Sequence, residues 1–298
     1  MDYDKEQLKA IQEKALEILL YFKEICDQHG IRFYVGSGCC IGAVRHHGFI
    51  PWDDDIDVFL LREDYERLPK VWNSFADTKR YAYCRTTETE NYHDAGASIR
   101  DNNTTFINKH CVNDDINQGL QIDLIPLDRR ADGMLSHSKQ VFWAMVYSLF
   151  NAQRLPDNQG GMTRLLAKIA YGIFSNKRIR DKIWRYAEQK MLLSPTDSWT
   201  YYTELVTGLK GLTLKYPKDF WDKPCYLPFE GYQIPVPSRY EEYLTMVFGD
   251  YMKLPPQEDQ VPKHNTAYID LNHSYKNYRG IHYFPQGKNE KVDNVFLL

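Results

Sequence analysis

The alternation of apolar and polar positions divides the chain into an N-terminal part with mixed periodicity and a C-terminal part that is mostly helical. Over residues 4–28, apolar side chains recur at intervals of three and four, which predicts an amphipathic helix that ends at Gly30. Shorter apolar runs predict strands at four places: 31–35, 55–61, 95–107 and 120–125, the last stopped by Pro126.

Helical spacing returns in five further segments: 39–46, 62–73, 136–154, 163–193 and 238–248. Residues 225–237 read as a hairpin or an extended loop, and the tail after Gly249 has little periodicity. The pattern predicts an α/β fold of the α+β type, in which a small mixed sheet is flanked by helices. We expect a core over residues 1–135 and a mostly helical region over 136–298 that completes a cleft with its hairpin and tail. Residues 157–161 are the best candidate for a linker.

Four aspartates stand within five residues, directly before the apolar run of the second predicted strand: Asp53, Asp54, Asp55 and Asp57. Side chains two apart on a strand share a face, so Asp53, Asp55 and Asp57 are expected to point the same way. Carboxylates this close repel one another and raise each other's pKa. A hard divalent cation such as Mg²⁺ or Mn²⁺ usually relieves that repulsion. The segment therefore predicts a metal site.

Two other features complete a recognisable set. Gly36 and Ser37 form a small-residue turn before a helix, where backbone N–H groups can bind phosphate. Asp123 alternates with apolar neighbours, so it is expected to project from one face of a strand. A Gly-Ser turn, an Asp-apolar-Asp pair and a later isolated acid resemble the pattern of the nucleotidyltransferase superfamily.

Longer segments resemble the LicD family, which includes bacterial phosphocholine transferases and the fukutin-type phosphotransferases. The segments that carry the resemblance are Tyr34-Val35-Gly36-Ser37-Gly38, Ile41-Gly42-Ala43-Val44-Arg45-His46, residues 48–57, Asp64-Tyr65, residues 122–128, Val236-Pro237, Tyr240, Tyr243-Leu244, residues 248–251, Leu254-Pro255-Pro256 and His264. Cys39-Cys40 and Phe248 depart from the residues usual in that family, but neither touches a proposed ligand. The resemblance spans about residues 30–265.

The resemblance implies a nucleotidyltransferase-like catalytic core and a transferase reaction. A phosphorylated alcohol, with phosphocholine favoured, would pass from a CDP-activated donor to a sugar hydroxyl, and CMP would leave. The expected partners are therefore CDP-choline or a related CDP-alcohol, and a glycan or lipid-linked glycan of the cell surface.

Roles for individual residues follow from the resemblance. Asp55, Asp57 and Asp123 would ligate Mg²⁺ or Mn²⁺, which clamps the donor diphosphate. Asp53 would join them or act as general base on the acceptor hydroxyl. The Gly36-Ser37 turn would hold phosphate. Three further phosphate-binding candidates are Arg45, Arg100 and His264.

Several alternatives remain open at the level of sequence. The acids fit the first, third and fifth positions of a calcium loop, but Val58 stands where that loop needs glycine. Asp123 can be an ordinary strand acid, Arg45 a charge at a helix C-terminus, and His264 a residue that orders the tail. A true nucleotidyltransferase that attacks an NTP, or a non-catalytic metal-binding module, would also carry such a cluster.

Composition limits the binding partners and the cellular compartment that we expect. The formal net charge of −3 excludes a general nucleic-acid-binding coat. The six cysteines show no zinc-ligand spacing, which favours a reduced compartment. The polar start and the lack of a long apolar run predict a cytoplasmic protein.

Two apolar helical stretches, 141–150 and 165–174, leave open a peripheral contact with a membrane. The latter precedes the basic Lys177-Arg178-Ile179-Arg180. These stretches either form the core of a helical bundle or make peripheral contact with the inner face of an anionic membrane.

Overall fold

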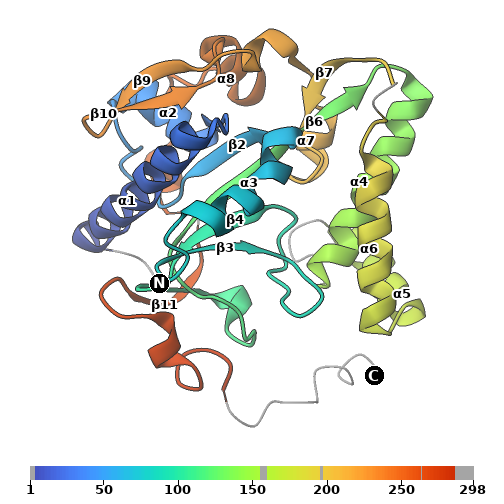
Figure 1. Cartoon of the computed structure of the whole chain (residues 1–298), viewed down its shortest axis with the longest axis horizontal. Coiled ribbons are helices and arrows are strands. Elements are labelled where there is room, and N and C mark those ends of the chain that lie inside the picture. The colour runs from blue at the N-terminus through green and yellow to red at the C-terminus, as the bar shows by residue number, and fades with distance from the viewer. Residues whose placement is uncertain (1–3, 155–159, 195–196, 263, 286–298) are drawn as a thin grey trace.

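A mixed sheet of seven strands forms the centre of the computed structural model, which describes residues 4–154, 160–194, 197–262 and 264–285 (Figure 1). The main path runs β1-β2-β6-β4-β3, with β7 on β6 and β8 on β7. The strands are β1 (Tyr34–Val35), β2 (Asp57–Leu61), β3 (Tyr81–Arg85), β4 (Ala97–Asp101), β6 (Gln121–Ala131), β7 (Trp199–Thr203) and β8 (Tyr216–Pro217). The predicted α+β class is confirmed.

Helices surround this sheet. In chain order they are α1 (Lys5–His29), α2 (Ser37–His46), α3 (Arg62–Phe75), α4 (Met134–Ala152), α5 (Gly160–Ile173), α6 (Lys177–Met191), α7 (Leu209–Thr213) and α8 (Tyr240–Phe248). Two strand pairs lie outside the main sheet: β9 (Cys225–Phe229) with β10 (Tyr232–Val236), and β5 (Thr105–Asn108) with β11 (Thr266–Asp270). The hairpin predicted over 225–237 is therefore confirmed.

The register at the centre of the sheet fixes which residues share a face. β2 runs parallel to β6 and pairs Asp57 with Asp123, while β4 runs antiparallel to β6 and pairs Ser98 with Asp123. Paired residues point to the same side of a sheet, so these three side chains lie on one face. Their neighbours Val58 and Leu124 are fully buried on the other face. One polar row is thus set into an otherwise apolar sheet.

Different parts of the chain pack on the two faces of the sheet. The long helix α1 begins where Asp4 accepts a hydrogen bond from the Gln7 N–H, and it ends at Gly30 in the left-handed region, as predicted. α1 and α3 contact β2, β4 and β6 and lie across the sheet in Figure 1. The ring of Phe59, on the opposite face, packs edge-on against Trp221 and Tyr243. The second half of the chain therefore covers the face that carries the acids.

The expected stop at Pro126 is wrong, because β6 continues for five more residues. The Asp123 N–H donates toward β2, to Ile56, and peptide groups alternate along a strand, so the nitrogen of Pro126 points to the opposite edge. On that edge β4 pairs only up to Leu124, and β7 begins pairing at Asp128. Pro126 lies between these two paired segments, so its lack of an N–H removes no hydrogen bond between strands.

Other boundaries also differ from the predictions. β2 begins at Asp57, so the acids before it are not on a strand. The segment 95–107 contains two strands, β4 and the start of β5, and the segment 163–193 contains two helices. Asn176 caps α6 by accepting from the Arg178 N–H, which interrupts the apolar periodicity. Four strands were not anticipated: β3, β7, β8 and β11.

The helices α4, α5 and α6 form a separate group beside the sheet (Figure 1), with a second small core around Trp184 and Tyr147. Of the predicted linker 157–161, residues 157–159 lie outside the described residues, and Gly160 and Gly161 belong to α5. The division at 135/136 stays a prediction. β7 and β8 from the second part join the main sheet.

Candidate active site

The first turn of α2 lies against the polar row of the sheet. The Gly36 N–H donates to the carbonyl of Asp57 at 3.0 Å, and the Ser37 N–H donates to the Tyr243 hydroxyl at 3.1 Å. A Cβ at Gly36 would stand 2.1 Å from the ring of Phe59, so only glycine fits this approach. The predicted Gly-Ser turn is therefore the start of a helix, held between β2 and α8.

Asp53, Asp54 and Asp55 converge in the loop that precedes β2. One carboxylate oxygen from each lies within 4.8 Å of the others. The loop turns where the Asp53 N–H donates to Ile50, and the Gln12 side chain of α1 donates to the Asp53 carbonyl at 2.8 Å. Asp54, which the alternation argument pointed away from the others, is part of this group and is almost fully buried.

Asp53 also lies against the start of α2. A Cβ at Gly38 would stand 2.3 Å from its Oδ2 atom. That oxygen is buried and accepts no hydrogen bond within the part of the chain that the structure describes. A buried carboxylate oxygen without a donor lowers the stability of the folded protein. The position therefore suits the binding of an ion or a ligand.

Mutual repulsion and burial perturb the acids strongly. Burial, followed by the charges of Asp55 and Asp54, raises the pKa of Asp53 to about 8. Burial raises the pKa of Asp55. Burial and the charge of Asp55 raise the pKa of Asp57 to about 7, although a hydrogen bond from the Ser37 side chain lowers it. Together the carboxylates require compensating positive charge, and His264 is a described residue whose charge lowers the pKa values of Asp55, Asp57 and Asp123.

Asp123 joins the group from the neighbouring strand. Its carboxylate accepts from the Gln121 side chain, and its N–H donates to Ile56 at 2.9 Å. Burial raises its pKa, and the charges of Asp94 and Asp57 raise it further. Asp57 and Asp123 lie outside the three-residue group of Asp53, Asp54 and Asp55 but are coupled to it electrostatically.

His264 brings positive charge to the cluster. Its Nδ1 lies 3.0 Å from Oδ1 of Asp54. Burial alone would lower the pKa of His264, but the hydrogen bond to Asp54 and the charges of Asp54, Asp55 and Asp123 raise it to about 9. The neighbouring carboxylates therefore favour the protonated imidazole, which links the C-terminal tail to the acidic loop through Asp54. The structure thus places the predicted residue His264 against the acidic loop, and its role in binding the donor stays a prediction.

The two predicted arginines are held by other partners. Arg45, at the far end of α2 and about 12 Å from Ser37 by helical rise, donates to the Tyr251 carbonyl at 2.9 Å. Arg100 is on the same sheet face as Asp123, but its guanidinium donates to Ser98 and to the Asn117 carbonyl. Their role as phosphate clamps stays a prediction.

Two acids near the cluster were missed from sequence. Asp94, in the loop before β4, raises the pKa of Asp123, and Glu204, just after β7, raises that of Asp57. Each lies in a segment without periodicity, so no pattern pointed to it. Glu204 is buried and accepts from the hydroxyls of Tyr216 and Thr207.

The donor set fits a hard divalent cation. It consists of carboxylate oxygens from one loop and two adjacent strands, of which Asp54 is buried and the others are half-buried. One oxygen of Asp53 has no donor among the described residues. Oxygen-only ligands favour Mg²⁺ or Mn²⁺ over zinc. His264 offsets only part of the negative charge.

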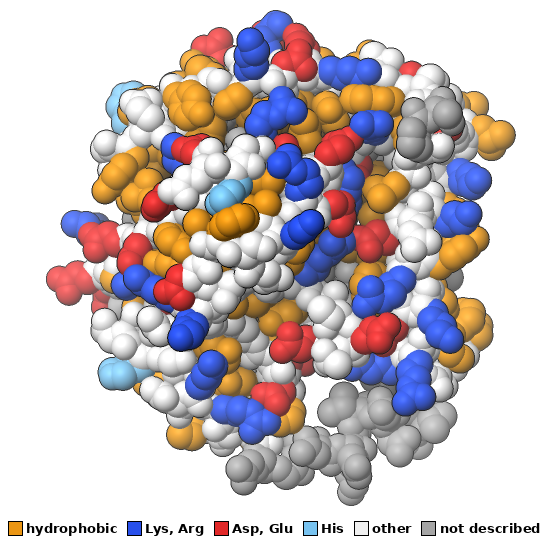
Figure 2. Space-filling model, in the orientation of Figure 1, with side chains coloured by type: hydrophobic (Ala, Val, Ile, Leu, Met, Phe, Trp, Pro, Cys, Tyr) orange, Lys and Arg blue, Asp and Glu red, His pale blue; other side chains and the backbone are white. Residues whose placement is uncertain are grey.

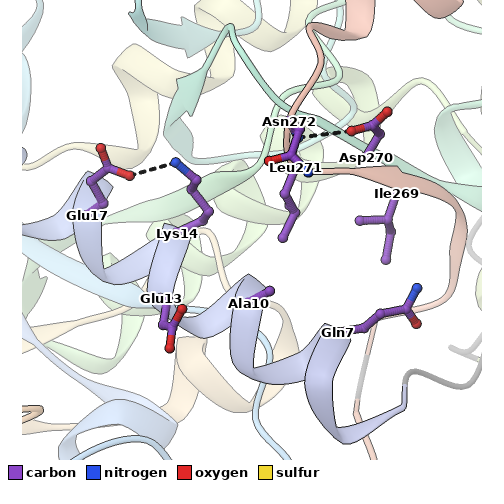
Figure 3. A pocket seen from close by; sticks show the side chains of 9 residues that line it. All are labelled: Gln7, Ala10, Glu13, Lys14, Glu17, Ile269, Asp270, Leu271 and Asn272. Atoms are coloured by element: carbon purple, nitrogen blue, oxygen red, sulfur yellow. Dashed lines mark hydrogen bonds and ion pairs between the residues drawn. The ribbon is translucent and has the colours of Figure 1, made fainter.

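A cavity of about 560 Å³ is separate from this cluster. It lies between α1 and residues 269–272, where Lys14 pairs with Glu17 (Figure 3). Gln12, which reaches Asp53, projects from the opposite side of α1 at 100° per residue. None of the clustered acids lines the cavity.

Comparison with known proteins shows which class of protein has this fold and this site. A family model described as "LicD/FKTN/FKRP, nucleotidyltransferase domain" matches residues 30–147, which include α2, β2 and most of α4. The fold and acid cluster thus define a protein with a nucleotidyltransferase-type domain.

Individual relatives narrow the class. The chain is 31% identical over 278 residues to the lipopolysaccharide cholinephosphotransferase LicD of Haemophilus influenzae, covering 89% of this chain and 99% of that protein. The uncharacterized protein RP689 of Rickettsia prowazekii is 36% identical over 76 residues (24% of this chain, 29% of that protein). The human ribitol 5-phosphate transferase FKRP is 35% identical over 57 residues (19% and 11%). The chain belongs to the LicD family, as its motifs predicted.

Proposed function

We propose that this protein is a Mg²⁺-dependent transferase that moves phosphocholine from CDP-choline to a sugar hydroxyl of a cell-surface glycan precursor, with release of CMP. The observation that carries the proposal is the similarity to the lipopolysaccharide cholinephosphotransferase, which extends over 89% of this chain. A match of that length includes the acidic loop, both acid-bearing strands and most of the second half.

The acid cluster supports a phosphoryl-transfer site. Asp55, Asp57 and Asp123 would hold the metal, because Asp57 and Asp123 stand opposite each other on β2 and β6 and Asp55 lies two residues before β2. When bound, Mg²⁺ neutralises charge on the donor diphosphate and on the leaving CMP. The N–H groups of Gly36 and Ser37 already donate to the Asp57 carbonyl and the Tyr243 hydroxyl, so a phosphate near this turn would be attracted by the positive dipole end of α2 and not by these two donors.

Asp53 is the proposed general base. Its Oδ2 has no donor among the described residues, and burial together with the charges of Asp55 and Asp54 raises its pKa to about 8, which favours uptake of a proton. The proton would come from the acceptor hydroxyl as its oxygen attacks the phosphorus of phosphocholine. Gly38 leaves the space that this carboxylate occupies.

The protonated His264 is a positioning residue in this scheme. Its hydrogen bond to Asp54 fixes the acidic loop. Because His264 lies 210 positions after Asp54 in the sequence, the C-terminal tail would contribute to the order of the site.

The test is incubation of the purified protein with Mg²⁺ and CDP-choline, CDP-ethanolamine, CDP-glycerol or CDP-ribitol, with and without sugar acceptors. We expect acceptor-dependent release of CMP, fastest with CDP-choline. No CMP from any donor, with the metal bound and suitable glycans present, would contradict the proposal.

A second function is favoured by the description of the matching family model as a nucleotidyltransferase domain. Such an enzyme attacks the α-phosphorus of an NTP and releases pyrophosphate. Incubation with CTP and choline phosphate distinguishes the two, because pyrophosphate appears only in that case.

A further inference from the structure

The segment 160–190, which spans α5 and most of α6, has a charge opposite to that of the rest of the chain. It holds eight lysines and arginines but two acids, in a protein whose net charge is −3. Both acids are turned inward: Asp181 is buried and accepts from Gln153, and Glu188 pairs with Arg85. The basic side chains are therefore left to dominate the surface of these helices.

An apolar stripe runs along α5 between these charges. Leu165, Ile169 and Ile173 are spaced four residues apart, so they lie on one side of the helix. Their exposed fractions are 52%, 51% and 68%, large for aliphatic side chains. The inner side of the same helix is occupied, because Ala167 is buried and the Tyr171 hydroxyl donates to the Leu149 carbonyl. The stripe is thus an outward face.

The flanks of the stripe are cationic. Lys168 lies on α5 itself, and Lys177 and Arg178 begin α6 directly after it; all three are exposed. Figure 2 shows lysine and arginine side chains beside apolar patches over the α4–α6 side of the molecule. A helix with an aliphatic face bordered by basic residues suits the boundary between headgroups and acyl chains of an anionic bilayer.

We propose that the outward face of α5, with the basic start of α6, is a docking surface for an anionic membrane. The occupant follows from charge complementarity: an aliphatic stripe alone would suit another protein or a second copy, but a cationic border around it favours anionic lipid headgroups. No helix of the described residues is long and apolar enough to span a bilayer, so the contact proposed is parallel to the surface. This inference does not depend on the transfer reaction.

Co-sedimentation with lipid vesicles tests the surface. We expect the full chain to bind vesicles that contain phosphatidylglycerol, to bind pure phosphatidylcholine at least tenfold more weakly, and to be released by high salt. The triple variant Leu165→Gln/Ile169→Gln/Ile173→Gln and the triple variant Lys168→Gln/Lys177→Gln/Arg178→Gln should each weaken binding at least tenfold.

Matched controls keep the test specific. Leu209, Leu254 and Ile281 are exposed to 58%, 51% and 69% in other parts of the chain, and their glutamine variants should bind as the wild type does. The charge control replaces three exposed lysines elsewhere: Lys5, Lys70 and Lys223.

Three outcomes would overturn the proposal. They are an absence of vesicle binding by the wild type, equal weakening by the control variants, and a wild-type dimer in light scattering that the α5 variant converts to monomer. Circular dichroism must show that each variant is folded. CMP release measured in detergent-free buffer tests the proposed function separately.

Discussion

Asp57 on β2 stands directly opposite Asp123 on β6 in the parallel ladder, so two acids from segments 66 residues apart face the same side of the sheet. Such a pair in a buried row is unfavourable unless positive charge or protons compensate. The relationship links the fold to the proposed chemistry, because a register shift of one residue would turn one of the two acids to the other face.

Replacing Asp57 by Asn should reduce CMP release at least about a thousandfold, because the site loses a proposed metal ligand. The folded state should be kept, since the substitution removes like-charge repulsion and preserves shape. The exposed Asp222 gives the control: Asp222→Asn should retain full activity. Comparable rates for Asp57→Asn and the wild type would exclude Asp57 from the site.

The metal-free protein should lose stability as the pH rises from about 4 to about 9. Folding raises the pKa of Asp53 to about 8 and of Asp57 to about 7, so the folded state binds more protons than the unfolded chain in this range. His264 acts in the same direction, because its stabilisation is complete below its unfolded pKa and is lost as the pH passes about 9. Each extra proton changes the free energy of unfolding by about 1.4 kcal/mol per pH unit.

Urea titrations at several pH values, in EDTA and in excess Mg²⁺, measure this slope. Mg²⁺ should raise the melting temperature more at pH 8 than at pH 5, because protons compete with the metal for the same oxygens. Asp55→Asn should flatten both dependences. A free energy of unfolding in EDTA that increases steadily from pH 4 to 8 would contradict the raised pKa values of Asp53 and Asp57 in the folded state.

Replacing Gly38 by Ala should lower the rate of transfer more than it lowers stability. The new Cβ would stand 2.3 Å from Oδ2 of Asp53, so the carboxylate must move. Gly172→Ala in α5 is the control, since nothing lies within 4 Å of that Cβ and alanine favours a helix by about 1 kcal/mol. Activity and melting temperature of both variants provide the measurement, and an unchanged rate for Gly38→Ala would rule out a strict position for Asp53.

Removing the His264 side chain should loosen the acidic loop. His264→Ala takes a charged hydrogen-bond partner from the buried Asp54, which should cost about 1–3 kcal/mol of stability. His264→Gln retains a donor and should recover part of the loss. Denaturant unfolding at pH 7 compares the three proteins, and equal stability of the alanine variant and wild type would mean that the tail is not held by this contact.

Local signals in the sequence were enough to predict several elements. The spacing of Leu8, Ile11 and Ala15, followed by Gly30, predicts α1, because helix formation and capping depend on neighbours along the chain. Asp123 could be recognised because apolar residues flank it in a buried strand.

Long-range contacts explain what the sequence could not reveal. From sequence alone Pro126 is typical of a strand end, because the unpaired stretch of β6 between its partners β4 and β7 is visible only in the fold. Asp94 and Glu204 lie in aperiodic loops, and only the fold places them near Asp123 and Asp57. Asp54 was misread because the strand periodicity was extended four residues before β2 begins. Short strands such as β8 depend on partners elsewhere in the chain.

The eleven residues of β6 carry Asp123 near one end and the ladder with β7 at the other. An excised fragment limited to residues 30–147 would therefore expose the edge at Asp128 and would lose Trp221 and Tyr243 from beneath Phe59. We expect such a fragment to be insoluble. We therefore expect the minimal folding unit of this protein to include chain far downstream of the proposed catalytic motifs.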